Sequence, residues 1–126
     1  MRTSLGFLLF ITLASSTFSI EITAEKLAKS LSSNVLKFKK DYEGKVVTVK
    51  GNSGIVKQSE SDYILIISYK TVNFTDPVVW CVLDAESLDR AASLKEKASV
   101  TVKGTVERLD STMGGYIIAL QKCSIL

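Results

Sequence analysis

The feature that constrains the fold most is a period of two in hydrophobicity, which occurs in two matching segments and ends at a glycine in both. Residues 47–51 and 100–104 each consist of Val-Thr-Val-Lys-Gly, so valines alternate with polar residues up to the glycine. Such alternation is typical of a β-strand with one buried face. A glycine inside such a strand indicates a bulge or a tight bend. The pattern therefore predicts strands that curl, as the corners of a barrel require.

Five segments after Gly44 have strand character. They are Lys45–Val56, Tyr63–Tyr69, Val78–Leu83, Ala98–Arg108 and Tyr116–Cys123. Between the third and fourth segments, Asp84 is a suitable N-cap for a short helix whose apolar side begins at Leu88. Before the strands, residues 23–42 have apolar side chains at every third or fourth position, which predicts a helix. The Ser-Ser-Asn sequence at 32–34 competes for backbone hydrogen bonds and indicates that this helix is kinked or split in two.

This order of elements, one helix followed by β-β-β-α-β-β, predicts a mainly β protein with helices. A five-stranded Greek-key barrel with a helix between strands 3 and 4 is an OB-fold, and the N-terminal helix is an addition to it. A β-sandwich is the alternative, but the lone helix and the glycines midway along two strands favour the barrel. A chain of 126 residues suits one domain. We expect a single OB-fold domain over residues 20–126, with its helix at 23–42 and its barrel at 45–126.

Residues 1–19 have the order of regions found in a secretory signal peptide. Arg2 precedes the apolar segment Leu5–Leu13, and mostly small residues follow. This segment is shorter than the roughly 20 residues that a membrane-spanning helix needs. We therefore expect cleavage near Ser16 or Ser19, a periplasmic or secreted protein, and no stable membrane insertion after cleavage. A buried N-terminal element and an uncleaved membrane anchor are the alternatives.

Several short motifs follow one another between Thr23 and Leu126. They are Thr-Ala-Glu-x-Leu at 23–27, Asn34, Tyr-x-Gly-Lys at 42–45, the two Val-Thr-Val-Lys-Gly segments, Cys81, Leu94, and Cys-Ser-Ile-Leu at 123–126. In order and spacing they resemble the tRNA_anti-like family, whose members are OB-fold domains of exported bacterial proteins. The resemblance implies an OB-fold and assigns no activity. Many such proteins carry a lipid-attachment cysteine after the signal peptide, whereas this chain has no cysteine there.

Cys81 and Cys123 are the two cysteines of the chain. An even number of cysteines in an exported protein indicates a disulfide. The strands that would carry them, the third and the fifth, are neighbours near the closure of an OB barrel. Two buried, reduced thiols are the alternative. A redox motif of the Cys-x-x-Cys type is absent from the sequence, and a metal site would lack further ligands.

The chain contains no histidine, which excludes Ser-His-Asp and Cys-His catalysis and every histidine-based zinc site. The carboxylates of Asp84, Glu86 and Asp89 fit the capping and dipole preferences at the start of a short helix. No serine–lysine pair has the setting that a hydrolase needs. We therefore expect no catalytic residue, no enzyme activity, no cofactor and no metal site.

Four aromatic side chains lie in the second and third predicted strands or between them, and two lysines lie nearby. OB barrels bind oligonucleotides or oligosaccharides on the face of these strands. The candidate ligand-binding residues are Tyr63, Tyr69, Phe74, Trp80, Lys57 and Lys70. Aromatic rings beside a basic groove are typical of single-strand binding. The alternative is that Tyr63 and Trp80 fill the core while Phe74 anchors a loop.

The net charge of +3 is too small to indicate a dedicated nucleic-acid binder, and the expected location outside the cytoplasm also argues against nucleic acid. The sequence therefore favours an exported, non-enzymatic module that binds a protein partner or an envelope ligand. An oligonucleotide- or oligosaccharide-binding barrel is the second hypothesis. The third is an envelope protein held at the membrane by an uncleaved leader.

Overall fold

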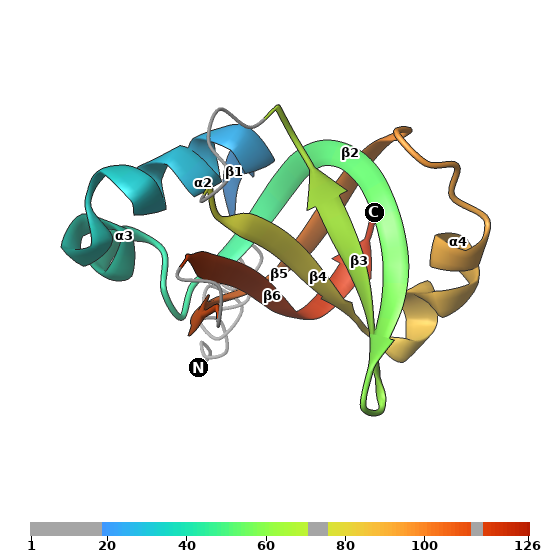
Figure 1. Cartoon of the computed structure of the whole chain (residues 1–126). Helices are drawn as coiled ribbons and strands as arrows, with labels where there is room; N and C mark the ends of the chain where they lie inside the picture. Colours follow the sequence, from blue (N-terminus) through green and yellow to red (C-terminus); the bar gives the residue numbers. More distant parts are fainter. Residues whose placement is uncertain (1–18, 71–75, 112–114) are drawn as a thin grey trace, which may run out of the picture.

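The computed structural model describes residues 19–70, 76–111 and 115–126, which form six strands and several short helices (Figure 1). The strands are β1 (Ile20–Thr23), β2 (Val46–Ser59), β3 (Asp62–Ser68), β4 (Val78–Leu83), β5 (Ser99–Asp110) and β6 (Tyr116–Ile125). The helices are α2 (Ala24–Ser33), α3 (Val35–Asp41), the 3-10 helix η2 (Ala85–Ser87) and α4 (Leu88–Ala92). All five predicted strands and the helix after the third are therefore present.

The six strands form one sheet that closes on itself through β2. Their order is β1-β2-β3-β4-β6-β5, with an additional pairing between β2 and β5. The first half of β2, Val46–Asn52, pairs with β5, and the second half, Asn52–Ser59, pairs with β3. In Figure 1 this strand is the long green arc that wraps around the barrel. The change of partner along β2 confirms the predicted OB-fold barrel.

The expected strand number was too low by one, because a short strand precedes the helices. The four residues of β1 pair in parallel with the start of β2, with Ile20 opposite Val47. A segment of this length is too short to display a period of two, and it follows directly on the predicted leader. The extra strand attaches the N-terminal part of the described chain to the barrel wall before α2 begins.

The helix expected over 23–42 is two helices that meet at Asn34. The backbone of Asn34 is extended, with φ −161° and ψ 100°, and its Oδ1 accepts a hydrogen bond of 3.0 Å from the Lys37 N–H. The amide side chain thus ends one helix and caps the next, which confirms the predicted split. Leu27 and Leu31 of α2 are fully buried against the barrel. Figure 1 shows α2 and α3 on one side of the barrel and α4 on the other.

Gly51 and Gly104 lie where other parts of the barrel approach the strands closely. A Cβ at Gly104 would lie 2.9 Å from the carbonyl oxygen of Gln121, and the register between β5 and β6 shifts at this residue. A Cβ at Gly51 would lie 2.5 Å from Cγ2 of Ile67. A second register shift, between β2 and β3, falls around Gly54. The bends that the glycines predicted are therefore present.

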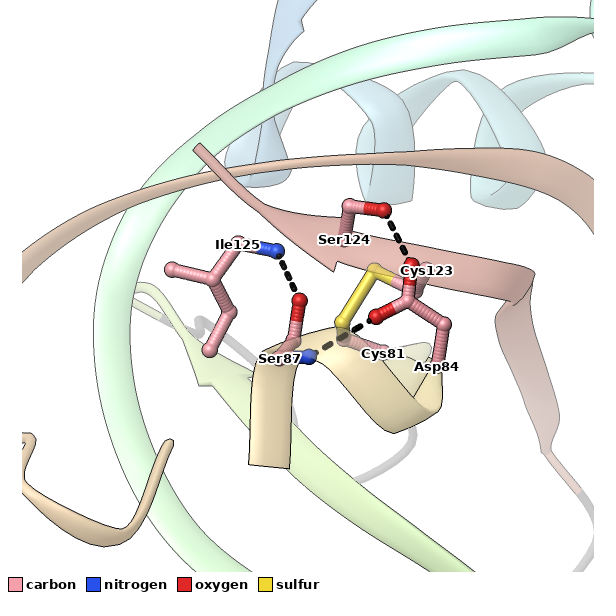
Figure 2. Close-up of a disulfide and its surroundings, with 6 residues drawn as sticks. All are labelled: Cys81, Asp84, Ser87, Cys123, Ser124 and Ile125. Carbon is pink, nitrogen blue, oxygen red and sulfur yellow. Dashed lines mark hydrogen bonds between the residues drawn. A yellow bond between two sulfur atoms is a disulfide. The ribbon is translucent and has the colours of Figure 1, made fainter. Parts of the chain in front are cut away.

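A disulfide joins Cys81 of β4 to Cys123 of β6, as the sequence indicated (Figure 2). The two Cα atoms are 5.4 Å apart and both residues are fully buried. The bond closes a loop across a sequence separation of 42 residues. By chain-entropy arguments, a loop of this size stabilises the folded state by about 4 kcal/mol.

A cluster of hydrogen bonds beside the disulfide holds η2 and α4 against β6 (Figure 2). The carboxylate of Asp84 accepts from the Ser124 hydroxyl and, at 3.0 Å, from the Ser87 N–H. The Ser87 hydroxyl oxygen in turn accepts from the Ile125 N–H at 2.9 Å. The hydrogen bonds to the Asp84 carboxylate hold its pKa below the usual range. The bond from Ser124 is the largest cause, and the bonds from Ser87 follow. The position of α4 is therefore fixed at its N-terminal end.

We expect Gly104→Ala to lower the free energy of unfolding by about 1–3 kcal/mol, because the new methyl group meets backbone rather than a movable side chain. Urea denaturation followed by circular dichroism measures this change. Gly44→Asn is the matched control: Gly44 has φ +81° with open space around it, and asparagine tolerates the left-handed region. Equal loss of stability in both variants would contradict a steric role for Gly104.

Candidate binding surface

Trp80 lies at the centre of the outer face of β3, β4 and β6. The strand register places Ile66 of β3 on one side of it and Ala119 of β6 on the other. Residues paired in this way share one face of a sheet. Their neighbours along the strands, such as Leu65 and Cys81, point into the core and are fully buried. Trp80 therefore does not fill the barrel interior, which was the alternative considered from the sequence.

Lys57 of β2 extends over this face and covers the ring of Trp80. Its Nζ lies 4.3 Å from the ring centroid, a cation–π contact. Lys57 is opposite Ile64 in the β2–β3 ladder, and Ile64 is opposite Val82 of β4. Ile64 and Ala119 also lie on the outer face, yet they are only 3% and 0% exposed. Larger neighbouring side chains on this face therefore cover them. The result is an apolar surface with one aromatic ring and one cation at its centre.

Tyr63 lies on the opposite face of the same hairpin. It shares a face with Val56 and Leu65, the face that turns toward the barrel interior and α4. Together with α4 it borders a groove of about 370 Å³, which is lined by Val56, Tyr63, Leu83, Leu88, Ala91 and Ala92. Tyr63 is therefore not part of the surface around Trp80.

Tyr69 and Lys70 lie beside α2. Both border a hollow of about 250 Å³ that also involves Lys29 of the helix and Pro77 at the start of β4. The Tyr69 hydroxyl donates to the carbonyl oxygen of Pro77. Burial, with the negative charges of Asp76 and Glu25 as smaller causes, raises the pKa of Tyr69 to about 12. This tyrosine fastens the start of β4 to the end of β3.

The six residues selected from the sequence thus separate into different places. Lys57 and Trp80 are in contact, Tyr63 lies behind them, and Tyr69 and Lys70 lie beside α2. Phe74 lies outside the described residues. The apolar neighbours of Trp80 were missed, namely Ile64, Ile66, Val82, Ile117 and Ala119. For Ile64 and Ile66, the signal was the unbroken apolar run Ile64–Ile67 in the second predicted strand, which is typical of a strand with apolar residues on both faces.

Within the ranges 19–70, 76–111 and 115–126, no three acidic or cysteine side chains gather in a way that could hold a metal ion. Over the same ranges no helix is long and apolar enough to cross a membrane. The carboxylate of Asp84 caps η2 through the Ser87 N–H and joins this helix to β6 through the Ser124 hydroxyl.

A closed barrel of this topology, with a helix before its last two strands, belongs to the class of OB-fold proteins. A crystal structure of a lipoprotein from Klebsiella pneumoniae, proposed to bind nucleic acid, is similar over 92% of this chain and 96% of its own, with a TM-score of 0.65 and 18% identity. The asparaginyl-tRNA synthetase of Pyrococcus horikoshii matches over 83% of this chain but 22% of its own, with a TM-score of 0.51 and 18% identity. A comparison with curated protein sequences gives no significant match.

The family is established by the sequence itself. The model of the tRNA_anti-like family matches residues 9–125, nearly the whole chain. The protein belongs to the tRNA_anti-like family, as its short motifs indicated. The family is one of OB-fold binding domains, and the synthetase above shares with this chain a part of its length only.

We expect Tyr69 to ionise about two pH units above an ordinary tyrosine, in accord with its raised pKa. In the unfolded chain it would ionise near pH 10, so the folded state loses stability as the pH rises from about 10 to 12. Ultraviolet titration of the native protein, compared with Tyr69→Phe, measures the late-ionising group. Alkaline denaturation that begins at the same pH in both proteins would contradict the assignment.

Proposed function

We propose that this protein is a non-enzymatic binding module that takes a short single-stranded segment of nucleic acid on the outer face of β3, β4 and β6. The observation that carries the proposal is the half-buried ring of Trp80 with Lys57 above it. An aromatic platform beside a cation is what unpaired bases and their phosphates require. The family and the proposed nucleic-acid binding of the similar lipoprotein support the same ligand class.

The cation over Trp80 is compatible with a base taking its place. An exposed cation–π contact is worth about 0.5–1 kcal/mol, whereas a base stacked on an aromatic side chain is worth about 1–3 kcal/mol. Lys57 is exposed, and a lysine side chain has several rotatable bonds, so a base can displace its ammonium group from the ring. The displaced ammonium group would then be free to contact a neighbouring phosphate. Replacement of the Lys57–Trp80 contact by a base stacked on Trp80 is therefore energetically favourable.

The weak overall charge sets the expected strength of binding. Without Arg2 the rest of the chain carries +2, so few phosphates would be neutralised. We expect modest affinity with a shallow dependence on salt. An oligosaccharide is the alternative ligand, because a sugar ring can also pack on Trp80. The protein partner that the sequence favoured has a separate candidate surface, which is described below.

We further propose that the protein is exported and that its folded domain spans residues 20–126. The leader-like order of residues 1–19 and the buried disulfide support export. The similar protein from Klebsiella is a lipoprotein, which fits an envelope location. The first described strand begins at Ile20, directly after the expected cleavage region around Ser16 or Ser19.

We expect an oligothymidylate of about ten nucleotides to quench the fluorescence of Trp80, the one tryptophan of the chain. In anisotropy titrations with the same labelled strand, Trp80→Ala is expected to weaken binding by about 1–3 kcal/mol. Lys57→Ala should weaken binding less and reduce the salt dependence by about one phosphate contact.

Tyr63→Ala is the matched control, since Tyr63 lies on the other face of the hairpin. It is expected to bind the labelled strand as the unaltered protein does. Loss of binding in Tyr63→Ala with no loss in Trp80→Ala would overturn the proposed surface. Quenching by an oligosaccharide in place of the oligothymidylate would change the ligand class but not the surface.

We expect the protein expressed in a bacterial host to be cleaved near Ser16 or Ser19 and recovered without its leader. N-terminal sequencing and intact mass of the envelope fraction measure the new N-terminus. An intact leader in the membrane fraction would instead support the uncleaved anchor.

A further inference from the structure

Among the described residues, the second half of β2 has a free edge. Val47–Lys50 lie between β1 and β5, but from Val56 to Ser59 the ladder of the described strands pairs β2 with β3 alone. On the other side, the last backbone bonds join Ser53 to Lys97 and Ala98, at 2.7 and 2.8 Å. In an antiparallel pair every second residue directs its N–H and C=O away from its partner. Those groups of the β2 end therefore face outward along an edge that no described strand covers.

Apolar side chains are exposed along this edge. Ile55, Val56 and Tyr63 are 57%, 43% and 42% exposed. Val56 and Tyr63 form one wall of the groove of about 370 Å³, and Ala92 of α4 lies on the other wall. Figure 1 shows the β2–β3 hairpin extending beyond the barrel on the side where α4 lies. An extended chain beside β2 would place its alternate side chains in this groove.

The charges next to the groove are predominantly negative. Asp84 and Asp89 each adjoin a lining residue in the sequence, and Glu86 lies one residue further away. Of the two basic residues that adjoin a lining residue, Lys57 lies over Trp80 on the other face of the hairpin. Arg90 donates to the Ile125 carbonyl oxygen at 3.2 Å and keeps its positive charge, so the three carboxylates on the α4 side outnumber one guanidinium. Hydrogen bonds from Ser124 and Ser87 hold the pKa of Asp84 below its usual range. The rim therefore complements a basic ligand.

We infer that the free edge of β2 and the groove beside α4 form a second binding site, which accepts an extended segment of a protein partner with alternating apolar and basic residues. The partner strand would pair with β2 through its backbone, and its apolar side chains would enter the groove. Its basic side chains would lie near the acidic rim. This site is distinct from the surface around Trp80, because Val56 and Lys57 face opposite sides of the hairpin.

A second copy of the chain is a poorer occupant of this edge. Two hairpins paired through β2 would bring two acidic rims together, and like charges across an interface oppose association. The segment 54–59 itself contributes one basic residue, Lys57, whose ammonium group lies over Trp80. The charge of the rim therefore selects a partner of different sequence.

A peptide of about six residues that alternates valine and lysine is the probe. Added to the isotope-labelled protein, it is expected to slow the hydrogen exchange of alternate amides between Gly54 and Ser59 and to shift the signals of Ala91 and Ala92. A peptide of the same sequence with methylated backbone nitrogens on alternate residues keeps the side chains but cannot pair. It is expected to bind at least about tenfold more weakly.

Ala92→Arg tests the groove from the protein side. Ala92 is exposed on α4, so a long basic side chain there fills the groove and repels lysine without entering the core. We expect at least about tenfold weaker peptide binding. Ala85→Arg is the matched control, because Ala85 is also exposed but does not line the groove. Trp80→Ala should leave peptide binding unchanged, and Ala92→Arg should leave oligothymidylate binding unchanged.

Three outcomes would overturn the inference. The first is equal binding of the methylated and unmethylated peptides, which would mean that no strand is added. The second is peptide-induced change confined to the surface around Trp80. The third is a dimer in sedimentation experiments whose interface protects the same β2 amides without peptide, because the occupant would then be a second copy.

Discussion

The structure depends on one strand that serves two neighbours in turn. β2 pairs with β5 until Asn52 and with β3 from there on, and this exchange closes the sheet. A strand can do this only if it bends sharply, and Gly51 and Gly54 lie at the bend, where side chains would collide with Ile67 and with the backbone of Ile66. Because the strand then leaves the barrel, its second half projects as a two-stranded ribbon. Both proposed surfaces lie on that ribbon or beside it.

Most of the architecture could be predicted because it depends on local patterns. Alternating valines, glycines inside strands and the Ser-Ser-Asn sequence each act over a few residues, and each produced the expected element. The disulfide also followed from a simple count of cysteines together with the fold. The strand Ile20–Thr23 escaped prediction because its pairing with β2 is a long-range contact, and four residues carry too little pattern to indicate it. The closure of the barrel could thus be predicted from the sequence, whereas the additional edge strand β1 could not.

The candidate site was predicted less well because it depends on which way each side chain points. Tyr63 and Trp80 are both aromatic strand residues, yet one borders the α4 groove and the other lies on the outer face. The register shift around Gly54 decides the facing of everything that follows it in β2, including Lys57. A bulge moves a side chain to the other face of a sheet, and sequence patterns do not locate it to one residue. The sequence showed which residue types could bind a ligand, but it did not show which face of the sheet each side chain occupies.

The pleat of the hairpin has one more consequence. Val56 and Lys57 are adjacent in the chain, so the two proposed sites are separated by a single layer of backbone. A ligand that displaced or stiffened this ribbon would change the free energy of occupying its reverse side. Thermodynamic linkage makes such an effect reciprocal: each ligand alters the affinity of the other by the same factor. The two proposed sites would thereby be coupled through the ribbon that they share.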